Sequence, residues 1–212
     1  MSHKLKLIFC HVPRTSGTSM TEFLRPHVGA DYVQDPQFEK HQAMRTIKLG
    51  FPKEVEKYAS LAMVRHPFDR FVSLHAGYSP KCTLDEMVYE IISGRLNLKK
   101  YAFYWSAQRW LCDINGNMLA THVFRLEDGI KPVVQLLNKL GALVKVEDYP
   151  HVNAGTADYK KQREACSDET MKGIEKIYSW DYNTFGYERC KNHAMQGKRK
   201  GQGETQAQIN SK

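Results

Sequence analysis

The stretch LIFCHVPRTSGTSM, residues 7–20, decides the fold of this chain. Its first four residues form a short apolar run, which is typical of a strand buried on both faces of a parallel sheet. A proline, a glycine and several hydroxyl-bearing residues follow and predict a tight turn. Thr18 or Ser19 is then expected to cap a helix that directs its apolar side chains toward the core. The sequence therefore predicts a strand, a turn and a helix N-terminus in succession.

A strand, a turn and a helix N-terminus in this order form a site for an anion. Backbone N–H groups of the turn and the helix dipole direct positive charge at one point, and the dipole alone is worth about 0.3–2 kcal/mol. Arg14 adds a permanent charge and a planar fork of donors that suits phosphate or sulfate oxygens. The stretch lacks the G-x-x-x-x-G-K-[ST] pattern of nucleoside-triphosphate loops. An ordinary corner with a surface arginine is the alternative at this point.

A second stretch, VRHPFDRFVS at residues 64–73, repeats this pattern. It closes the apolar run Ser60–Arg65 and continues with the apolar spacing of a helix. Arg65, at the carboxyl end of the predicted strand, can reach a phosphate, and Ser73 on the next helix can donate its hydroxyl to the same group. Arg70 is expected to pair with an acidic residue; the alternative is a basic helix start with a solvated face. Two strand–loop–helix units in succession predict an α/β fold with a parallel sheet.

The rest of the chain predicts further helices and one further strand. Helices are predicted over five stretches: Gln37–Leu49, Thr83–Leu98, the aromatic-rich Tyr101–Trp110, Ile130–Leu140 and Asp168–Tyr178. The last of these is expected to be the final helix of the chain, with Ser167 or Asp168 as its cap. Thr121–Phe124 is the third predicted strand.

Size and composition are those of one globular domain and a tail. The chain has 212 residues, 42% of them hydrophobic and 25% charged, so residues 1–190 are expected to form a single domain. Residues 191–212 are rich in Gln, Gly, Asn and Ser and carry five basic residues against one acidic residue, so 5 − 1 = +4 of the net +8 lies there. Such a tail is typical of a disordered segment. The other +4 gives little reason to expect nucleic-acid binding.

The sequence carries no signal for a membrane span, a leader peptide or a metal site. No apolar run approaches the 18 or so residues of a membrane helix, and the start MSHKLKLIFCH runs directly into the first stretch. The five cysteines are scattered and form no CxxC pair, which argues against zinc and against a disulfide framework. A cytoplasmic location is therefore expected, unless the chain is an excised catalytic fragment. There is equally no signal for an oligomeric state.

The two stretches resemble motifs of the sulfotransferases that use 3′-phosphoadenosine 5′-phosphosulfate (PAPS). Residues 11–19, H-x-P-R-T-x-G-T-S, resemble their 5′-phosphosulfate loop, and most closely that of the carbohydrate branch, H-[IV]-P-K-T-[GS]-G-T-[ST]. Arg14 stands where that branch has a lysine. Residues 64–73 resemble the 3′-phosphate segment, V-R-[DNH]-P-[YF]-[DE]-R-[LF]-[VL]-S. The two motifs occur in the family's order, about fifty residues apart.

Three further segments are similar to the same family. FRLED at 124–128, HVNA at 151–154 and IYSWDYNTFGY at 177–187 resemble its R-x-E-[DN], H-[LV]-N-x and Y-x-x-D-[FY]-x-x-F-G-Y stretches. By this resemblance Glu127 is structural, the HVNA segment lies near the cofactor, and the last segment packs in the core. The resemblance implies a three-layer, P-loop-like α/β fold with a central, mainly parallel sheet flanked by helices.

The resemblance also implies a cofactor site and a reaction. The residues implied to bind PAPS are Pro13, Arg14, Thr15, Ser16, Gly17, Thr18, Ser19, Arg65, Ser73 and Asn153. The reaction is in-line transfer of a sulfuryl group to an acceptor hydroxyl, of a carbohydrate by resemblance, without a metal. Positioning and charge stabilisation are expected to supply most of the catalysis, as in phosphoryl transfer. Arg14 would stabilise the charge that grows on the oxygen between phosphorus and sulfur, and an arginine gives up no proton there.

An acceptor hydroxyl also needs a general base, and a histidine suits this role near neutral pH. His41 is the candidate because several carbohydrate sulfotransferases have a histidine between the two cofactor motifs, in a segment like KHQA at residues 40–43. A surface histidine on a polar helix is the alternative reading of His41, and Glu39 is the alternative base.

Two other functions fit parts of the sequence. A kinase with a divergent phosphate loop would need a carboxylate to hold Mg²⁺ near Thr18, and no Asp or Glu closes either apolar strand. A catalytically inactive relative could bind the nucleotide or an anionic glycan, and the arginine at position 14 keeps this alternative open.

Overall fold

A three-stranded parallel sheet lies at the centre of the part of the chain that the structure describes. The structure is a computed structural model that describes residues 1–29, 41–78, 81–96, 101–150, 152 and 159–189. The strands are β1 (Leu7–Cys10), β2 (Ala59–Val64) and β3 (His122–Arg125), and they lie side by side in the order β1-β2-β3. Cys10 pairs with Ala62, and Val64 pairs with Arg125. Because all described strands are parallel, the loops that follow them emerge at one edge of the sheet.

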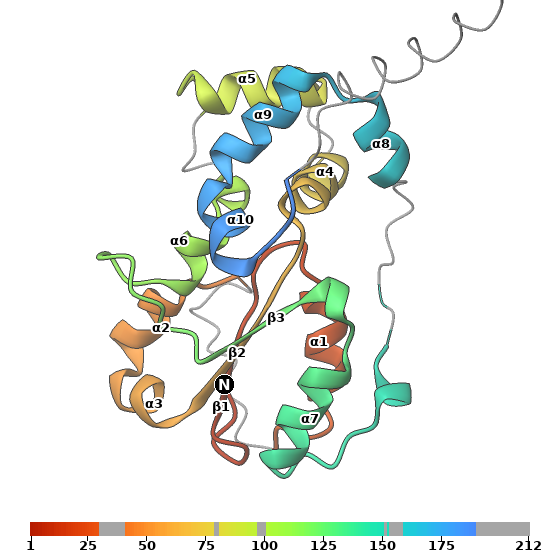
Figure 1. The fold of residues 1–212 in the computed structure, drawn as a ribbon. Coiled ribbons are helices and arrows are strands. Elements are labelled where there is room, and N and C mark those ends of the chain that lie inside the picture. Colours follow the sequence, from red (N-terminus) through yellow and green to blue (C-terminus); the bar gives the residue numbers. More distant parts are fainter. Residues whose placement is uncertain (30–40, 79–80, 97–100, 151, 153–158, 190–212) are drawn as a thin grey trace, which may run out of the picture.

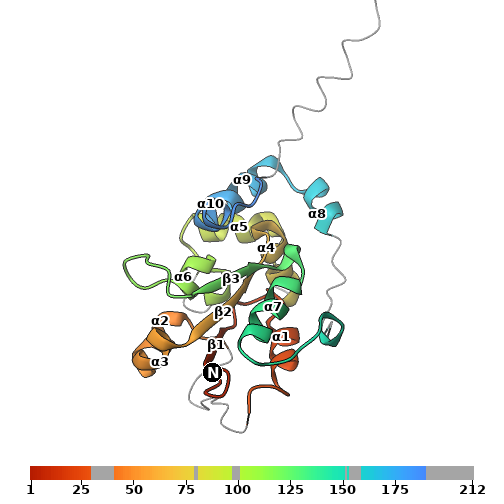
Figure 2. The same ribbon diagram turned by 60° about the horizontal axis from the view of Figure 1, so that its bottom comes forward.

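Helices cover both faces of this sheet and form three layers (Figures 1 and 2). One face carries α1 (Gly17–Leu24) and α7 (Lys131–Lys139); the other carries α2 (Met44–Gly50), α3 (Pro52–Lys57) and α6 (Ala107–Leu111). Successive strand residues point to opposite faces. The strand residues buried toward α1 and α7 are Leu7, Leu61 and Met63, and those buried toward the other layer are Ile8, Cys10, Ala62 and Val64. The predicted α/β fold with a parallel sheet between helices is confirmed.

A group of helices lies beyond the carboxyl ends of the strands, in the upper part of Figure 1. These helices are α4 (Pro67–Tyr78), α5 (Leu84–Ile92), α8 (Tyr159–Ala165), α9 (Asp168–Ile177) and α10 (Ser179–Phe185). Three short 3₁₀ helices complete the description: η1 (Ala102–Tyr104), η2 (Leu126–Asp128) and η3 (Val146–Asp148). Within the described ranges no helix has both the length and the apolar character that a membrane span requires.

Local signals explain where several helices begin and end. The Thr83 hydroxyl and the Glu86 carboxylate form a capping box at the start of α5, and Ser167 caps α9 through the backbone N–H of Thr170. The helix predicted to run to Leu98 ends at Ile92, because Gly94 adopts a left-handed conformation two residues later. The prediction that α9 is the last helix is wrong, since α10 follows it directly.

The helix predicted over Tyr101–Trp110 is wrong as one element and is in fact two short helices, η1 and α6. Arg70 accounts for the break, because its guanidinium donates to the carbonyls of Phe103 at 3.0 Å and Trp105 at 2.9 Å. Asp181 then starts α6, since both carboxylate oxygens accept from the Ala107 N–H at 2.9 Å. Tertiary contacts therefore override the continuous apolar pattern.

Arg70 and Asp181 form the buried ionic pair that joins α4 to α10. The Arg70 guanidinium lies 3.9 Å from the Asp181 carboxylate, and both side chains are buried. The predicted pairing of Arg70 with an acidic residue is confirmed, although its shorter contacts are to backbone carbonyls. Burial raises the pKa of Asp181 to about 6, and the charge of Arg70 opposes this shift. Arg70 also donates to the Pro13 carbonyl at 3.1 Å, so the pair supports the loop after β1.

Candidate active site

The loop between β1 and α1 has an unusual backbone. Arg14 and Ser16 both adopt left-handed conformations, with φ of 63° and 64°. A left-handed non-glycine residue costs about 1–2 kcal/mol, and such strain gathers at functional sites. A turn of this kind directs successive backbone N–H groups to its concave side, which forms an anion-binding nest. The Thr15 side chain is buried between these residues and donates to the Val12 carbonyl at 2.8 Å.

The left-handed turn also corrects the predicted start of the helix. Helix α1 begins at Gly17 with Ser16 as its N-cap residue, so the prediction that Thr18 or Ser19 caps it is wrong. Ser16 makes no side-chain cap, and its hydroxyl instead lies 2.9 Å from the Tyr149 hydroxyl. The Ser16 side chain therefore does not cap the first N–H groups of α1, which point toward the loop as at any helix N-terminus.

Gly17 is required because the His11 ring occupies the place of its side chain. A Cβ atom built on Gly17 would lie 1.8 Å from Cδ2 and 1.9 Å from Nε2 of His11. The ring of His11 is buried and stacks on Phe9, with 5.7 Å between the centroids. The first residue of the motif, His11, therefore packs against the residue that starts the helix.

Replacing Gly17 with alanine is expected to destabilise the protein and to change the shape of the loop between β1 and α1, residues 11–16, which we call the anion loop. The methyl group would overlap the buried His11 ring, and overpacking of this kind costs about 1–3 kcal/mol. We expect a lower melting temperature and at least about tenfold weaker anion binding, a loss of about 1.4 kcal/mol. Thermal unfolding and calorimetry with 3′-phosphoadenosine 5′-phosphate (PAP) measure the two effects. Unchanged stability and affinity would show that the loop tolerates displacement of His11.

The two sequence motifs meet at Arg14. Its Nε donates to the Ser73 hydroxyl oxygen at 2.9 Å, across 59 positions of sequence. Ser73 lies on α4 and is only 3% exposed, whereas Arg14 is exposed to solvent. Because Nε donates to Ser73, the other donors of the guanidinium are those on its two terminal nitrogens. The arginine of the first motif is thus oriented by the serine of the second.

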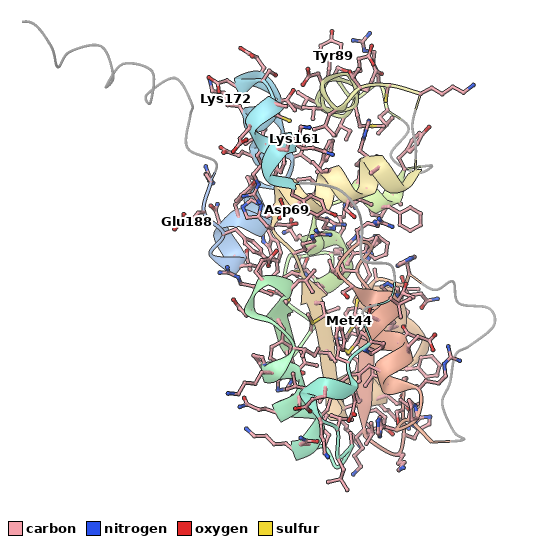
Figure 3. All side chains as sticks on the ribbon, turned by 90° about the vertical axis from the view of Figure 1, so that its right-hand side faces the viewer. Met44, Asp69, Tyr89, Lys161, Lys172 and Glu188 are labelled. Atoms are coloured by element: carbon pink, nitrogen blue, oxygen red, sulfur yellow. The ribbon has the colours of Figure 1, made fainter. Side chains whose placement is uncertain are left out.

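Arg65 lies at the same edge of the sheet, directly after β2. Its guanidinium is 4.4 Å from the centroid of the Tyr159 ring, the first residue of α8. Helix α8 is held on α4 by an ion pair of 2.6 Å between Arg163 and Asp69. Figure 3 shows Asp69 beneath α8, the helix that carries Lys161. The second motif therefore contacts α8 through Arg65, Phe68 and Asp69, and the sequence did not reveal the contact with Tyr159.

His41 does not lie on a helix, so the predicted helix over Gln37–Leu49 is wrong at residues 41–43. Helix α2 begins at Met44, His41 lies in the segment before it, and residues 37–40 lie outside the described residues. The Nδ1 atom of His41 lies 3.0 Å from the backbone oxygen of His11. The non-helical segment before α2 thus packs His41 on the first motif.

This contact determines the tautomer of His41 and places its ring beside the loop. A carbonyl oxygen only accepts, so Nδ1 carries the proton and Nε2 is the basic nitrogen of the neutral ring. The ring centroid is 4.2 Å from that of His11, 5.2 Å from Phe103 and 6.4 Å from Trp110. His41 therefore combines a basic nitrogen with a position next to the anion loop and beside the aromatic rings of Phe103 and Trp110.

A second loop lies against the first motif from the other side. The Ser19 hydroxyl donates to the Val152 carbonyl and accepts from the Val152 N–H, both at 3.1 Å. Tyr149 contacts Ser16, and burial raises the pKa of Tyr149, so its hydroxyl stays protonated near neutral pH. These contacts join the predicted HVNA segment to the first motif, although Asn153 itself lies outside the described residues. Tyr149 was not among the predicted site residues, and its position next to Pro150, just before the HVNA segment, was the sequence feature that could have pointed to it.

Glu127 and His66 tie β3 to the second motif. One Glu127 oxygen accepts from the His66 backbone N–H at 2.7 Å, and the other accepts from the Tyr187 hydroxyl at 3.0 Å. The structural role predicted for Glu127 is confirmed. Burial, and secondly the charge of Arg163, lower the pKa of His66, so its ring is neutral at pH 7.

The fold and the loop define an α/β protein of P-loop-like architecture with a left-handed turn at the carboxyl edge of its sheet. Comparison with protein families identifies the family: residues 1–188 match the model of the sulfotransferase family, and the chain belongs to this family. Comparisons with curated proteins and with solved structures gave no significant match. Membership assigns the chain the general reaction of this family, transfer of a sulfuryl group. Residues 191–212 lie outside both the match and the described residues.

Proposed function

We propose that this chain transfers the sulfuryl group of PAPS to a hydroxyl group of a carbohydrate. The observation that carries the proposal is the contact between Arg14 and Ser73, which joins the two motifs that resemble the PAPS-binding segments. Arg65 lies at the same edge of the sheet, because β1 and β2 are adjacent and parallel. One bisphosphate nucleotide can therefore contact both motifs.

The loop after β1 would hold the 5′-phosphosulfate. The left-handed turn and the start of α1 would supply the backbone N–H groups of residues 15–19. The hydroxyls of Thr15 and Ser19 donate to carbonyls within the protein, so these two residues would contact the cofactor through their backbone. Pro13 contributes by position, since Arg70 holds its carbonyl. By resemblance, Arg65 and Ser73 would hold the 3′-phosphate. Ser73 accepts the bond from Arg14 with its oxygen, so its hydroxyl proton is left for an anion.

In the reaction the acceptor oxygen attacks sulfur in line with the bond that breaks. A bond forms between acceptor oxygen and sulfur, the bond between sulfur and the bridging oxygen breaks, and PAP leaves with the electron pair. Arg14 would stabilise the negative charge that develops on the bridging oxygen. Because Ser73 already orients the guanidinium, this stabilisation needs little rearrangement of the side chain. Nε2 of His41 takes the proton of the acceptor hydroxyl.

An aromatic wall supports a carbohydrate as the acceptor. Phe103 and Trp110 stack on each other near His41, with an angle of 6° between their planes. Phe103, Tyr101 and Trp105 are partly exposed, and flat aromatic faces suit the apolar faces of sugar rings. Tyr104 is buried and belongs to the core.

Calorimetry and an acceptor screen test this function. We expect PAP to bind without Mg²⁺ and labelled PAPS to transfer its sulfuryl group to at least one sugar in a panel of neutral and anionic glycans. Binding of ATP that depends on Mg²⁺, with no binding of PAP, would instead indicate a kinase. Binding of PAP with no transfer to any acceptor would indicate the inactive relative.

A further inference from the structure

Gly77 lies against the guanidinium of Arg14. It is four residues after Ser73 on α4, so both residues face the same side of the helix. A Cβ atom built on Gly77 would lie 3.0 Å from Cζ, 3.0 Å from Nη1 and 3.2 Å from Nη2 of Arg14. Since these three distances are nearly equal, that position lies over the face of the guanidinium plane rather than at its edge.

The space taken by the guanidinium is the space of a side chain at position 77. Nonbonded heavy atoms normally lie about 3.5–4.0 Å apart, so any Cβ at this position would push the guanidinium away. Ser73 holds Arg14 by Nε, and the absence of a side chain at Gly77 makes room for the terminal nitrogens. The two residues therefore determine where the planar end of Arg14 lies.

We propose that Gly77 is a positioning residue that makes room for an arginine at position 14, where the carbohydrate sulfotransferase motif that this stretch resembles has a lysine. The proposal rests on the proposed function. A lysine ends in one nitrogen and lacks the two branches of a guanidinium, so it needs less room over α4. Gly77 thus leaves room for the branched end of Arg14 while Ser73 holds its Nε.

The substitution Gly77→Ala is expected to raise the stability of the protein and to lower its rate of catalysis. Gly77 is exposed and helical, and alanine is a better helix former than glycine. The atoms that the new methyl group would meet belong to the end of a flexible side chain, so Arg14 moves and the fold does not resist. A residue with a merely structural role would not combine higher stability with lower turnover.

The experiment introduces Gly77→Ala into the wild-type chain and into the Arg14→Lys variant, and measures melting temperature, PAP affinity and transfer from labelled PAPS to the best acceptor of the panel. In the wild-type background we expect a higher melting temperature and a kcat lower by about fivefold, because a displacement of 1 Å can cost about 10²-fold and the methyl group moves the guanidinium by a few tenths of an ångström. In the Arg14→Lys background we expect a change of less than about twofold.

Equal losses of kcat in the two backgrounds, or no loss in the wild-type background, would overturn the proposal. A crystal structure of the Gly77→Ala variant gives a second readout that is independent of turnover. The guanidinium of Arg14 is expected to have moved away from residue 77 by a few tenths of an ångström or more, and an unmoved guanidinium would refute the inference. Failure of the wild-type chain to bind PAP would instead reject the function itself, so the two failures are distinguishable.

Discussion

Arg14→Ala is expected to lower sulfuryl transfer by about 10³-fold, because the variant loses the one cation that the first motif places at the anion loop. Arg14 is exposed, and its Nε is held by Ser73 at 2.9 Å, so its donors are oriented before the substrate arrives. Such a preoriented donor contributes more than a mobile one, since no reorganisation is needed during the reaction. Steady-state rates with labelled PAPS and the acceptor found in the screen measure the loss.

The Arg14→Lys variant separates charge from shape. A lysine keeps the charge at this position, so we expect it to retain much of the activity; an inactive lysine variant would show that the planar fork is needed. Arg25→Ala is the matched control, because Arg25 is an exposed arginine of the segment after α1 that pairs with Glu22 at 2.8 Å. Activity close to that of the wild type in Arg14→Ala would remove Arg14 from the mechanism.

His41→Ala is expected to leave PAP affinity unchanged and to lower turnover by about 10²–10⁴-fold, which is the usual contribution of a general base. The structure gives the reason, because the proton on Nδ1 makes Nε2 the basic nitrogen, and the ring contacts His11 at the start of the anion loop. Calorimetry with PAP and steady-state rates measure the two quantities separately. Unchanged turnover would contradict the assignment of His41 as the base.

His41→Asn tests whether this loss comes from the base or from the packing of the loop. The asparagine amide can donate to the His11 carbonyl in place of Nδ1, and it has no basic nitrogen. We therefore expect His41→Asn to be as slow as His41→Ala, and its rate to lose the fall at acidic pH that a histidine base produces. A fast His41→Asn variant would mean that His41 acts only by holding the loop. Glu39, the alternative base, lies outside the described residues.

Several elements were predictable from short stretches because their causes are local. The apolar runs that became β1 and β2 and the capped helices α5 and α9 follow from neighbouring residues alone. The start of α1 was predicted two or three residues too late, because the left-handed conformation of Ser16 depends on contacts of the loop with distant residues such as Tyr149. The break between η1 and α6 likewise depends on Arg70.

The residues themselves were enough to predict a parallel sheet, an anion loop and a family with two cofactor motifs, since period, turn chemistry and motif spacing are properties of the chain. They did not show which side chains meet. Arg14 touches Ser73 and Gly77, and His41 touches the His11 carbonyl, because the packing of α4 and of the segment before α2 against the sheet brings these groups together. Such contacts join positions 30 to 63 residues apart, so their geometry depends on helix packing and is absent from any local pattern.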